Sequence, residues 1–112
     1  MKKIAIVTCL QANDVCAGCS CLQALNNRRA YFEQYASENV ELCAFMRCSQ
    51  CGVDPEDDRG MLEKLERLVK VGVETAHIGI CAKKRDGTIC PHMQKTADWL
   101  NTHGIQVIWG TH

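Results

Sequence analysis

Two cysteines, Cys48 and Cys51, stand two residues apart directly after an apolar run over residues 40–46. A Cys-x-x-Cys pair suits two chemistries, because paired thiolates can hold a metal ion and a dithiol can cycle with a disulfide. The apolar run is typical of a buried strand, so the pair is predicted at the carboxyl end of that strand. The positions of the other cysteines and histidines bear on which chemistry applies.

The elements that must position this pair alternate between strand and helix signals. Strands are predicted over residues 4–8, 40–46, 74 or 75 to 80, and 105–109. A first helix is predicted from Ser20, where Ser20 to Gln23 fits a capping box, to a point before Val40. A second begins after Asp57 or Asp58 and ends before Gly72, and a third runs from Cys90-Pro91 to Gly104.

Strands that alternate with helices, without a hairpin signal between them, indicate right-handed crossovers and a parallel sheet. We therefore expect residues 1–112 to form one small three-layer α/β domain. Its parallel sheet should contain about four strands with helices on both faces, in a flavodoxin-like or Rossmann-like arrangement.

This architecture predicts where the cysteines meet, because the segments that follow parallel strands all lie at one edge of the sheet. Eight of the nine cysteines and two histidines follow strands in this way: Cys9, Cys16, Cys19, Cys21, Cys48, Cys51, Cys81, Cys90, His92 and His112. Helix N-termini reach the same edge and favour thiolate over thiol. We expect these ten residues to be the candidate metal ligands, with Cys16, Cys19 and Cys21 as a possible second group.

The remaining cysteine and histidines have ordinary explanations. Cys43 lies inside the second predicted strand and is predicted to be a small core residue. His77 and His103 lie away from the cysteine edge, and we expect them to be packed or surface histidines.

The overall composition argues against several classes of protein. Thirteen basic and thirteen acidic residues cancel, so no global field indicates a nucleic acid or an anionic membrane as partner. No stretch approaches the roughly 18 apolar residues that span a bilayer. The apolar run after Met1 stops at Leu10, too early for a signal peptide, so we expect a cytoplasmic protein. In a reducing cytoplasm, nine cysteines indicate metal or thiol chemistry rather than structural disulfides.

The ordered set of motifs resembles the CGGC-domain proteins, which are named for a Cys-Gly-Gly-Cys in mid-chain. The resemblance rests on Cys9, the loop Cys16-Ala-Gly-Cys-Ser-Cys21, the central Cys48-Ser-Gln-Cys51, Cys81, Cys90-Pro91-His92 and the closing Thr111-His112. Here Ser49 and Gln50 replace the two central glycines, which keeps the spacing of the sulfurs. The resemblance implies metal binding, with zinc as the metal.

Three functions remain open from the sequence. The first is zinc binding, favoured because His92 and His112 can add nitrogen to thiolate ligands. The second is an iron–sulfur cluster for electron transfer or storage, with Cys9, Cys48, Cys51 and Cys81 as ligands. The third is a thiol–disulfide oxidoreductase that uses Cys48 and Cys51. It is the weakest, because turn residues delay the next helix. The expected partners are the metal ion and a redox or metal-transfer protein.

Overall fold

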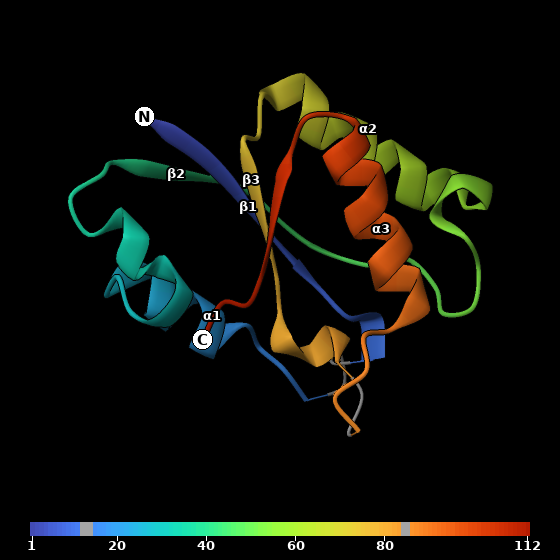
Figure 1. The fold of residues 1–112 in the computed structure, drawn as a ribbon, viewed down its shortest axis with the longest axis horizontal. Coiled ribbons are helices and arrows are strands. Elements are labelled where there is room, and N and C mark those ends of the chain that lie inside the picture. Colours follow the sequence, from blue (N-terminus) through green and yellow to red (C-terminus); the bar gives the residue numbers. More distant parts are fainter. Residues whose placement is uncertain (12–14, 84–85) are drawn as a thin grey trace.

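The four strands form one parallel sheet in the order β2-β1-β3-β4 (Figure 1). A computed structural model describes residues 1–11, 15–83 and 86–112. The strands are β1 (Lys2–Thr8), β2 (Val40–Arg47), β3 (Thr75–Ile78) and β4 (Gln106–Trp109). The helices are α1 (Cys19–Asn26), α2 (Arg59–Val71) and α3 (Pro91–Thr102), and short 3-10 turns are η2 (Ala30–Tyr35), η3 (Pro55–Asp57) and η4 (Ile80–Ala82).

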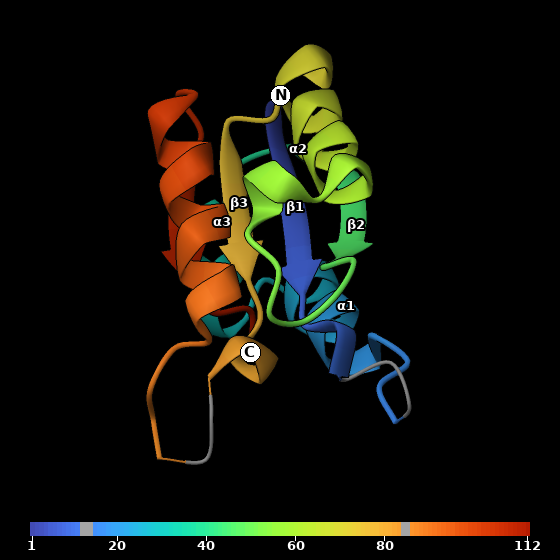
Figure 2. The same ribbon diagram turned by 90° about the vertical axis from the view of Figure 1, so that its right-hand side faces the viewer.

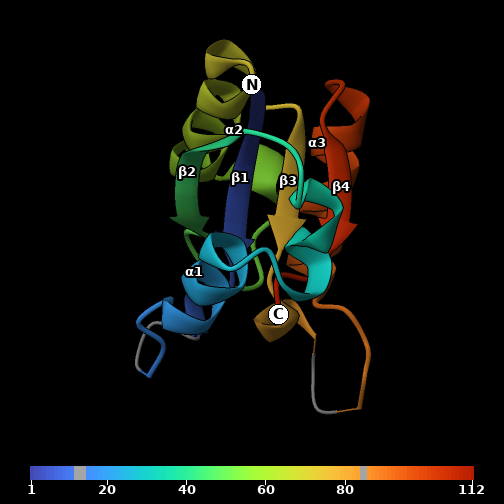
Figure 3. The same ribbon diagram turned by 90° about the vertical axis from the view of Figure 1, so that its left-hand side faces the viewer.

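The sheet confirms the predicted α/β class. All four strands lie side by side in Figure 3, and each neighbouring pair is parallel. The order β2-β1-β3-β4 matches the first four strands of the flavodoxin-like order. β1 therefore lies inside the sheet, between β2 and β3, and its carboxyl end is flanked by the ends of both neighbours.

Helices cover both faces of the sheet because the central strand is apolar on both sides. Ile4 and Ile6 of β1 pack with residues of α1 and η2, whereas Ala5 and Val7 pack with residues of α2 and α3. Successive side chains of a strand point to opposite faces, so one continuous apolar run serves both cores. Figure 2 shows α2 and α3 together on one face.

The second and third helices begin and end where the sequence predicts. Asp58 caps α2, since its carboxylate oxygen Oδ1 accepts the Met61 N–H at 3.2 Å. Gly72 follows the helix in the left-handed conformation, with φ of 85°. Pro91 occupies the first turn of α3 after Cys90, so the start of that helix lies at the cysteine edge.

The prediction of one long first helix is wrong. The segment divides into α1 and η2, because Arg28 and Ala30 have positive φ angles of 52° and 51°. The Arg28 guanidinium bridges the break by donating to the carbonyl oxygens of Leu25 and Tyr35. The capping box is also wrong, since Gly18 rather than Ser20 precedes the helix and no side chain caps it.

The third strand is shorter than predicted. β3 ends at Ile78, and the chain turns into η4 because the Gly79 N–H still donates to the Val7 carbonyl while Ala82 donates back to Gly79. Cys81 therefore lies in a tight turn instead of after a straight strand. No helix in the part of the chain that the structure describes is long and apolar enough to cross a membrane.

Candidate metal site at the carboxyl edge of the sheet

Cysteines from three neighbouring strands lie at the carboxyl edge of the sheet. Cys9 follows β1, Cys48 follows β2, and Cys81 lies in η4 directly after β3. The chain leaves β1 toward β2 on one side and returns as β3 on the other, so the ends of β1 and β3 are a topological switch point. Ligands of α/β sheets bind at such points, and here the position is occupied by Cys9 and Cys81.

Three consecutive backbone N–H groups after β1 donate to three different cysteine sulfurs. The N–H of Cys9 donates to Cys81 Sγ at 3.2 Å, and that of Leu10 donates to Cys48 Sγ at 3.1 Å. The N–H of Gln11 donates to Cys9 Sγ at 3.4 Å. N–H donors stabilise a sulfur most when it is negatively charged. Sulfur from three strand ends is thus gathered around one short stretch of backbone suited to thiolates.

Four cysteines form what we call the first thiol group: Cys9, Cys48, Cys51 and Cys90. Burial raises the pKa of the Cys48 thiol, and the Leu10 N–H lowers it in part. The negative charges of the other three members raise the pKa of Cys48 further. The other three thiols are therefore close enough to Cys48 to influence its ionisation. These effects together favour the protonated form of the Cys48 thiol.

Three more cysteines form the second thiol group: Cys16, Cys21 and Cys81. Burial raises the pKa of the Cys81 thiol, the Cys9 N–H lowers it, and the charges of Cys9, Cys21 and Cys16 raise it again. Cys9 acts on both Cys48 and Cys81, so it lies between the two groups. This agrees with the position of β1 between β2 and β3.

The side chain of Gln11 connects the exposed Cys51 to the buried sulfurs. Its amide nitrogen Nε2 donates to Cys51 Sγ at 3.1 Å, while its backbone N–H donates to Cys9 Sγ. Cys51 is exposed and Cys48 is buried, so the two thiols of the central pair differ in access to solvent. One residue from the turn after β1 thus contacts two members of the first thiol group.

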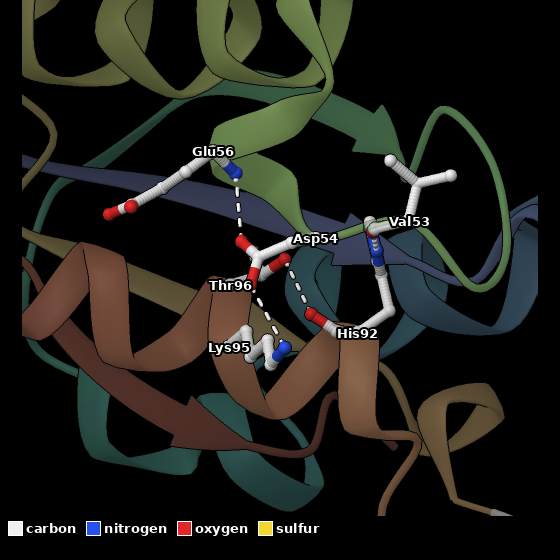
Figure 4. A network of polar contacts seen from close by, with 6 residues as sticks. All are labelled: Val53, Asp54, Glu56, His92, Lys95 and Thr96. Atoms are coloured by element: carbon white, nitrogen blue, oxygen red, sulfur yellow. Dashed lines mark hydrogen bonds and ion pairs between the residues drawn. The ribbon is translucent and has the colours of Figure 1, made fainter.

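His92 has a free, buried nitrogen. Its Nδ1 lies 2.6 Å from the Val53 carbonyl oxygen, which can only accept, so Nδ1 carries the proton (Figure 4). Its Nε2 is consequently an acceptor, and it is buried without a hydrogen-bond partner among the described residues. A histidine that binds metal through Nε2 shows this same pattern, with the other nitrogen donating to a carbonyl.

The loop that bears Val53 is held by an ion pair beside it. Lys95 Nζ lies 2.9 Å from Asp54 Oδ2, and the other carboxylate oxygen of Asp54 accepts the Glu56 N–H at 3.0 Å (Figure 4). The hydrogen bond from Lys95 holds the pKa of Asp54 below its ordinary value. Because Lys95 and His92 belong to the same helix, α3, the ion pair keeps the Val53 carbonyl near the histidine ring.

Cys21 and His112 meet through the hydroxyl of Thr111. Cys21 Sγ lies 3.1 Å from Thr111 Oγ1, which lies 3.0 Å from His112 Nδ1. The distance from Cys21 Sγ to His112 Nδ1 is 3.9 Å. In Figure 1 the carboxyl terminus accordingly lies beside α1. The geometry thus associates His112 with the second thiol group.

Cys16 and Cys19 differ from each other. The Gly18 N–H donates to Cys16 Sγ at 3.3 Å, and the Arg47 guanidinium donates to the Cys16 carbonyl at 3.0 Å. These contacts hold Cys16 near the end of β2. Cys19 is exposed on the first turn of α1, and among the described residues it has no hydrogen bond to a member of either thiol group.

The donors suit a thiophilic metal but are not assembled around one point. Thiolates and a free imidazole nitrogen are the ligands that zinc prefers. Among residues 1–11, 15–83 and 86–112, however, no three His, Cys, Asp or Glu side chains are grouped closely enough to hold one ion as they stand. Side chains would therefore have to rotate before these donors could hold one ion.

Comparison with known families agrees with this arrangement of cysteines. Residues 3–112 match the CGGC domain. The chain belongs to the CGGC domain family. The resemblance predicted from the cysteine order is confirmed over essentially the whole chain. No curated protein and no solved structure shows significant similarity to it.

Several residues of this CGGC domain contact the candidate ligands and were not predicted to do so, among them Gln11, Arg47, Val53 and Thr111. Gln11 follows Cys9 by two residues, Arg47 precedes Cys48, and Thr111 precedes His112. Closeness in the sequence to a candidate ligand was therefore the feature that could have identified these three residues. Val53 acts through its backbone carbonyl, for which its side-chain type carries no signal.

Proposed function

We propose that this CGGC domain binds zinc through thiolates at the carboxyl edge of its sheet, at two positions that correspond to the two thiol groups. The supporting observation is the run of three N–H groups that donate to Cys81, Cys48 and Cys9. Such donors offset the negative charge that remains on sulfur after its proton leaves. Buried sulfur without a metal does not need them, whereas thiolate ligands do.

The first position would use the first thiol group, with His92 as a further donor from α3. Cys48 is held protonated by its burial, so binding must release its proton as the thiolate forms. The unpartnered Nε2 of His92 supports a nitrogen ligand near Cys90, since a buried acceptor without a partner is costly. The four thiols and His92 offer more than the four donors that zinc needs. The bound ion would therefore have a closed coordination shell, either with a structural role or as metal held for transfer.

The second position would use the second thiol group together with His112. The pKa of Cys81 is raised by burial, so binding there also releases a proton. The contact of His112 with Cys21 through Thr111 supports mixed sulfur and nitrogen ligation. Iron–sulfur clusters usually take sulfur alone, so the two imidazoles favour zinc.

The dithiol alternative has less support. A redox Cys-x-x-Cys pair needs a thiol whose pKa is lowered, usually at the start of a helix. Here burial raises the pKa of Cys48, and α2 begins only at Arg59, after η3. The free state of all nine cysteines suits a reducing cytoplasm. There the exposed Cys51 would be the point at which a metal-transfer or redox protein approaches.

Elemental analysis of protein purified without oxygen, from cells given zinc and iron, tests the proposal. Wild-type protein should contain two zinc ions per chain and be colourless. The double variant C48A/C51A should retain one zinc, and C43A is the matched control, since Cys43 lies in β2 away from the edge and should leave both ions bound. Iron with labile sulfide, no metal, or full zinc in C48A/C51A would each contradict the proposal.

A further inference from the structure

A buried histidine outside the cysteine edge holds the backbone that carries His112. His77 of β3 is 0 % exposed, and its Nδ1 lies 3.0 Å from the Gly110 carbonyl oxygen. A carbonyl can only accept, so Nδ1 carries the proton. The other ring nitrogen, Nε2, therefore accepts the hydroxyl of Tyr35 at 2.7 Å. Both ring nitrogens are satisfied in a neutral imidazole.

The surroundings of His77 allow one orientation of the ring. Phe32 packs against it with ring centroids 4.5 Å apart, and Tyr35 meets it edge-on at 5.6 Å. Burial lowers the pKa of His77, which keeps the ring neutral and the donor at Nδ1 in place. The imidazole is thus a fixed donor aimed at one carbonyl beyond the end of β4.

The residue that accepts this bond has no room for a side chain. Gly110 has a φ of 144°, and a Cβ at this position would overlap the ring of Tyr31. The backbone therefore lies between Tyr31 on one side and the His77 donor on the other. This contact places residue 110 in one position relative to β3.

From that position the next residues reach the second thiol group. Thr111 is 0 % exposed, with its hydroxyl 3.1 Å from Cys21 Sγ and 3.0 Å from His112 Nδ1. A shift of the Gly110 carbonyl would move both contacts, because the carbonyl carbon is bonded directly to the nitrogen of Thr111, whose hydroxyl makes both.

We propose that His77 is a positioning residue for the second metal position: through the Gly110 carbonyl it places Thr111 and His112 against Cys21. Its role in metal binding rests on the proposed function, whereas its role in placing residues 110–112 does not. His77 then does what outer residues do around metal-binding histidines, which is to fix a ligand's orientation from behind. His77, which the sequence predicted to be an ordinary packed residue, would thus have a specific positioning role.

The test compares His77→Leu, which removes both hydrogen bonds, with His77→Asn, whose side-chain amide can still donate to Gly110. His103→Asn is the control, because His103 stacks on Trp99 and its Nδ1 pairs with the Trp99 carbonyl, so its contacts lie within the end of α3. Zinc affinity is measured by competition with a chromophoric chelator, and amide hydrogen exchange is followed in the carboxyl-terminal peptide by mass spectrometry. Urea unfolding checks that each variant is folded.

The zinc ion that C48A/C51A retains identifies the second position. In H77L we expect the affinity for this ion to fall about 10- to 100-fold. The affinity for the other ion should not change, and exchange at residues 111 and 112 should be faster. H77N should restore most of the affinity, and H103N should match the wild type. A general loss of folding stability would weaken the binding of both zinc ions, so it can be distinguished from the loss of one ion that we expect.

Equal zinc affinity and equal exchange in H77L and wild type would overturn the inference. If H77L does not fold, Tyr35→Phe replaces it, since that variant keeps His77 but removes the hydroxyl that fixes Nε2, and it should produce a smaller change in the same direction. If wild-type protein binds no zinc, the proposed function fails, and hydrogen exchange alone decides whether His77 positions the terminal residues.

Discussion

At the level of single residues, the proposed metal binding depends on buried thiols that accept backbone N–H groups. Cys48 and Cys81 both have a raised pKa, chiefly because of burial, and both accept a backbone N–H. Burial favours the neutral thiol and the N–H donors favour the thiolate. Removing the proton in exchange for a cation resolves this conflict, which is why metal affinity should depend on pH.

If the protein binds zinc as proposed, its zinc affinity should accordingly rise with pH. Each thiol that is protonated in the metal-free protein and ionised in the complex adds about a tenfold gain per pH unit, below its own pKa. Because the ordinary pKa of these thiols is 9.0 and burial raises it, the gain should continue through pH 7 and 8. Competition titrations between pH 6 and 8 measure the slope. An affinity that is constant over this range would show that the ligands are already ionised.

The residues that carry this conflict were only partly predictable. Strand ends follow from apolar runs, so Cys9, Cys48 and Cys81 could be assigned to one edge from the sequence. The directions of the N–H groups of Leu10 and Gln11 follow from the turn after β1, and no sequence pattern specifies such a turn. The sequence also did not specify which cysteines His112 would meet; in the structure it lies near Cys21, on the far side of the Thr111 hydroxyl.

At the level of elements, local signals succeeded where capping chemistry is simple and failed where the backbone is strained. Asp58 and Gly72 bound α2 as predicted, because an N-terminal acceptor and a left-handed glycine each have one clear role. The break between α1 and η2 lacks such a residue. Ala30 takes a positive φ that favours glycine, so helical periodicity alone predicted a continuous helix.

That strain predicts opposite effects for two exposed alanines. Ala30 has φ of 51°, a conformation that costs an L-residue roughly 1–2 kcal/mol, so Ala30→Gly should recover most of this against the extra freedom of the unfolded chain. Ala36 has φ of −54°, where glycine loses roughly 0.5–1 kcal/mol. In urea unfolding, A30G should exceed A36G in stability by about 1 kcal/mol. Equal losses in both variants would contradict the strained conformation at Ala30.

At the level of the whole molecule, the sheet topology brings together cysteines that no single sequence motif contains. Cys9, Cys48 and Cys81 are far apart in the chain, yet the order β2-β1-β3-β4 places their strands side by side. The predicted right-handed crossovers were enough to bring them to one edge. The spacing between sulfurs at that edge depends on rotamers and turns, and in the described residues no three donors are grouped for one ion. Folding therefore collects the candidate ligands, and in the proposed function metal binding would have to complete the site.

If folding gathers the ligands and zinc binds as proposed, the free energy of unfolding should depend on the zinc concentration. An ion that binds only the folded protein adds about 1.4 kcal/mol to the free energy of unfolding for each tenfold rise in free zinc above its dissociation constant. Two bound ions should give wild-type protein a slope of about 2.7 kcal/mol per tenfold, and C48A/C51A a slope of about half that. Urea unfolding in metal-buffered solutions measures both slopes, with C43A expected to follow the wild type. Because unfolded cysteines also bind zinc, both slopes can be smaller, but their ratio should stay near two. Equal slopes for wild type and C48A/C51A would mean that the central cysteines hold no ion.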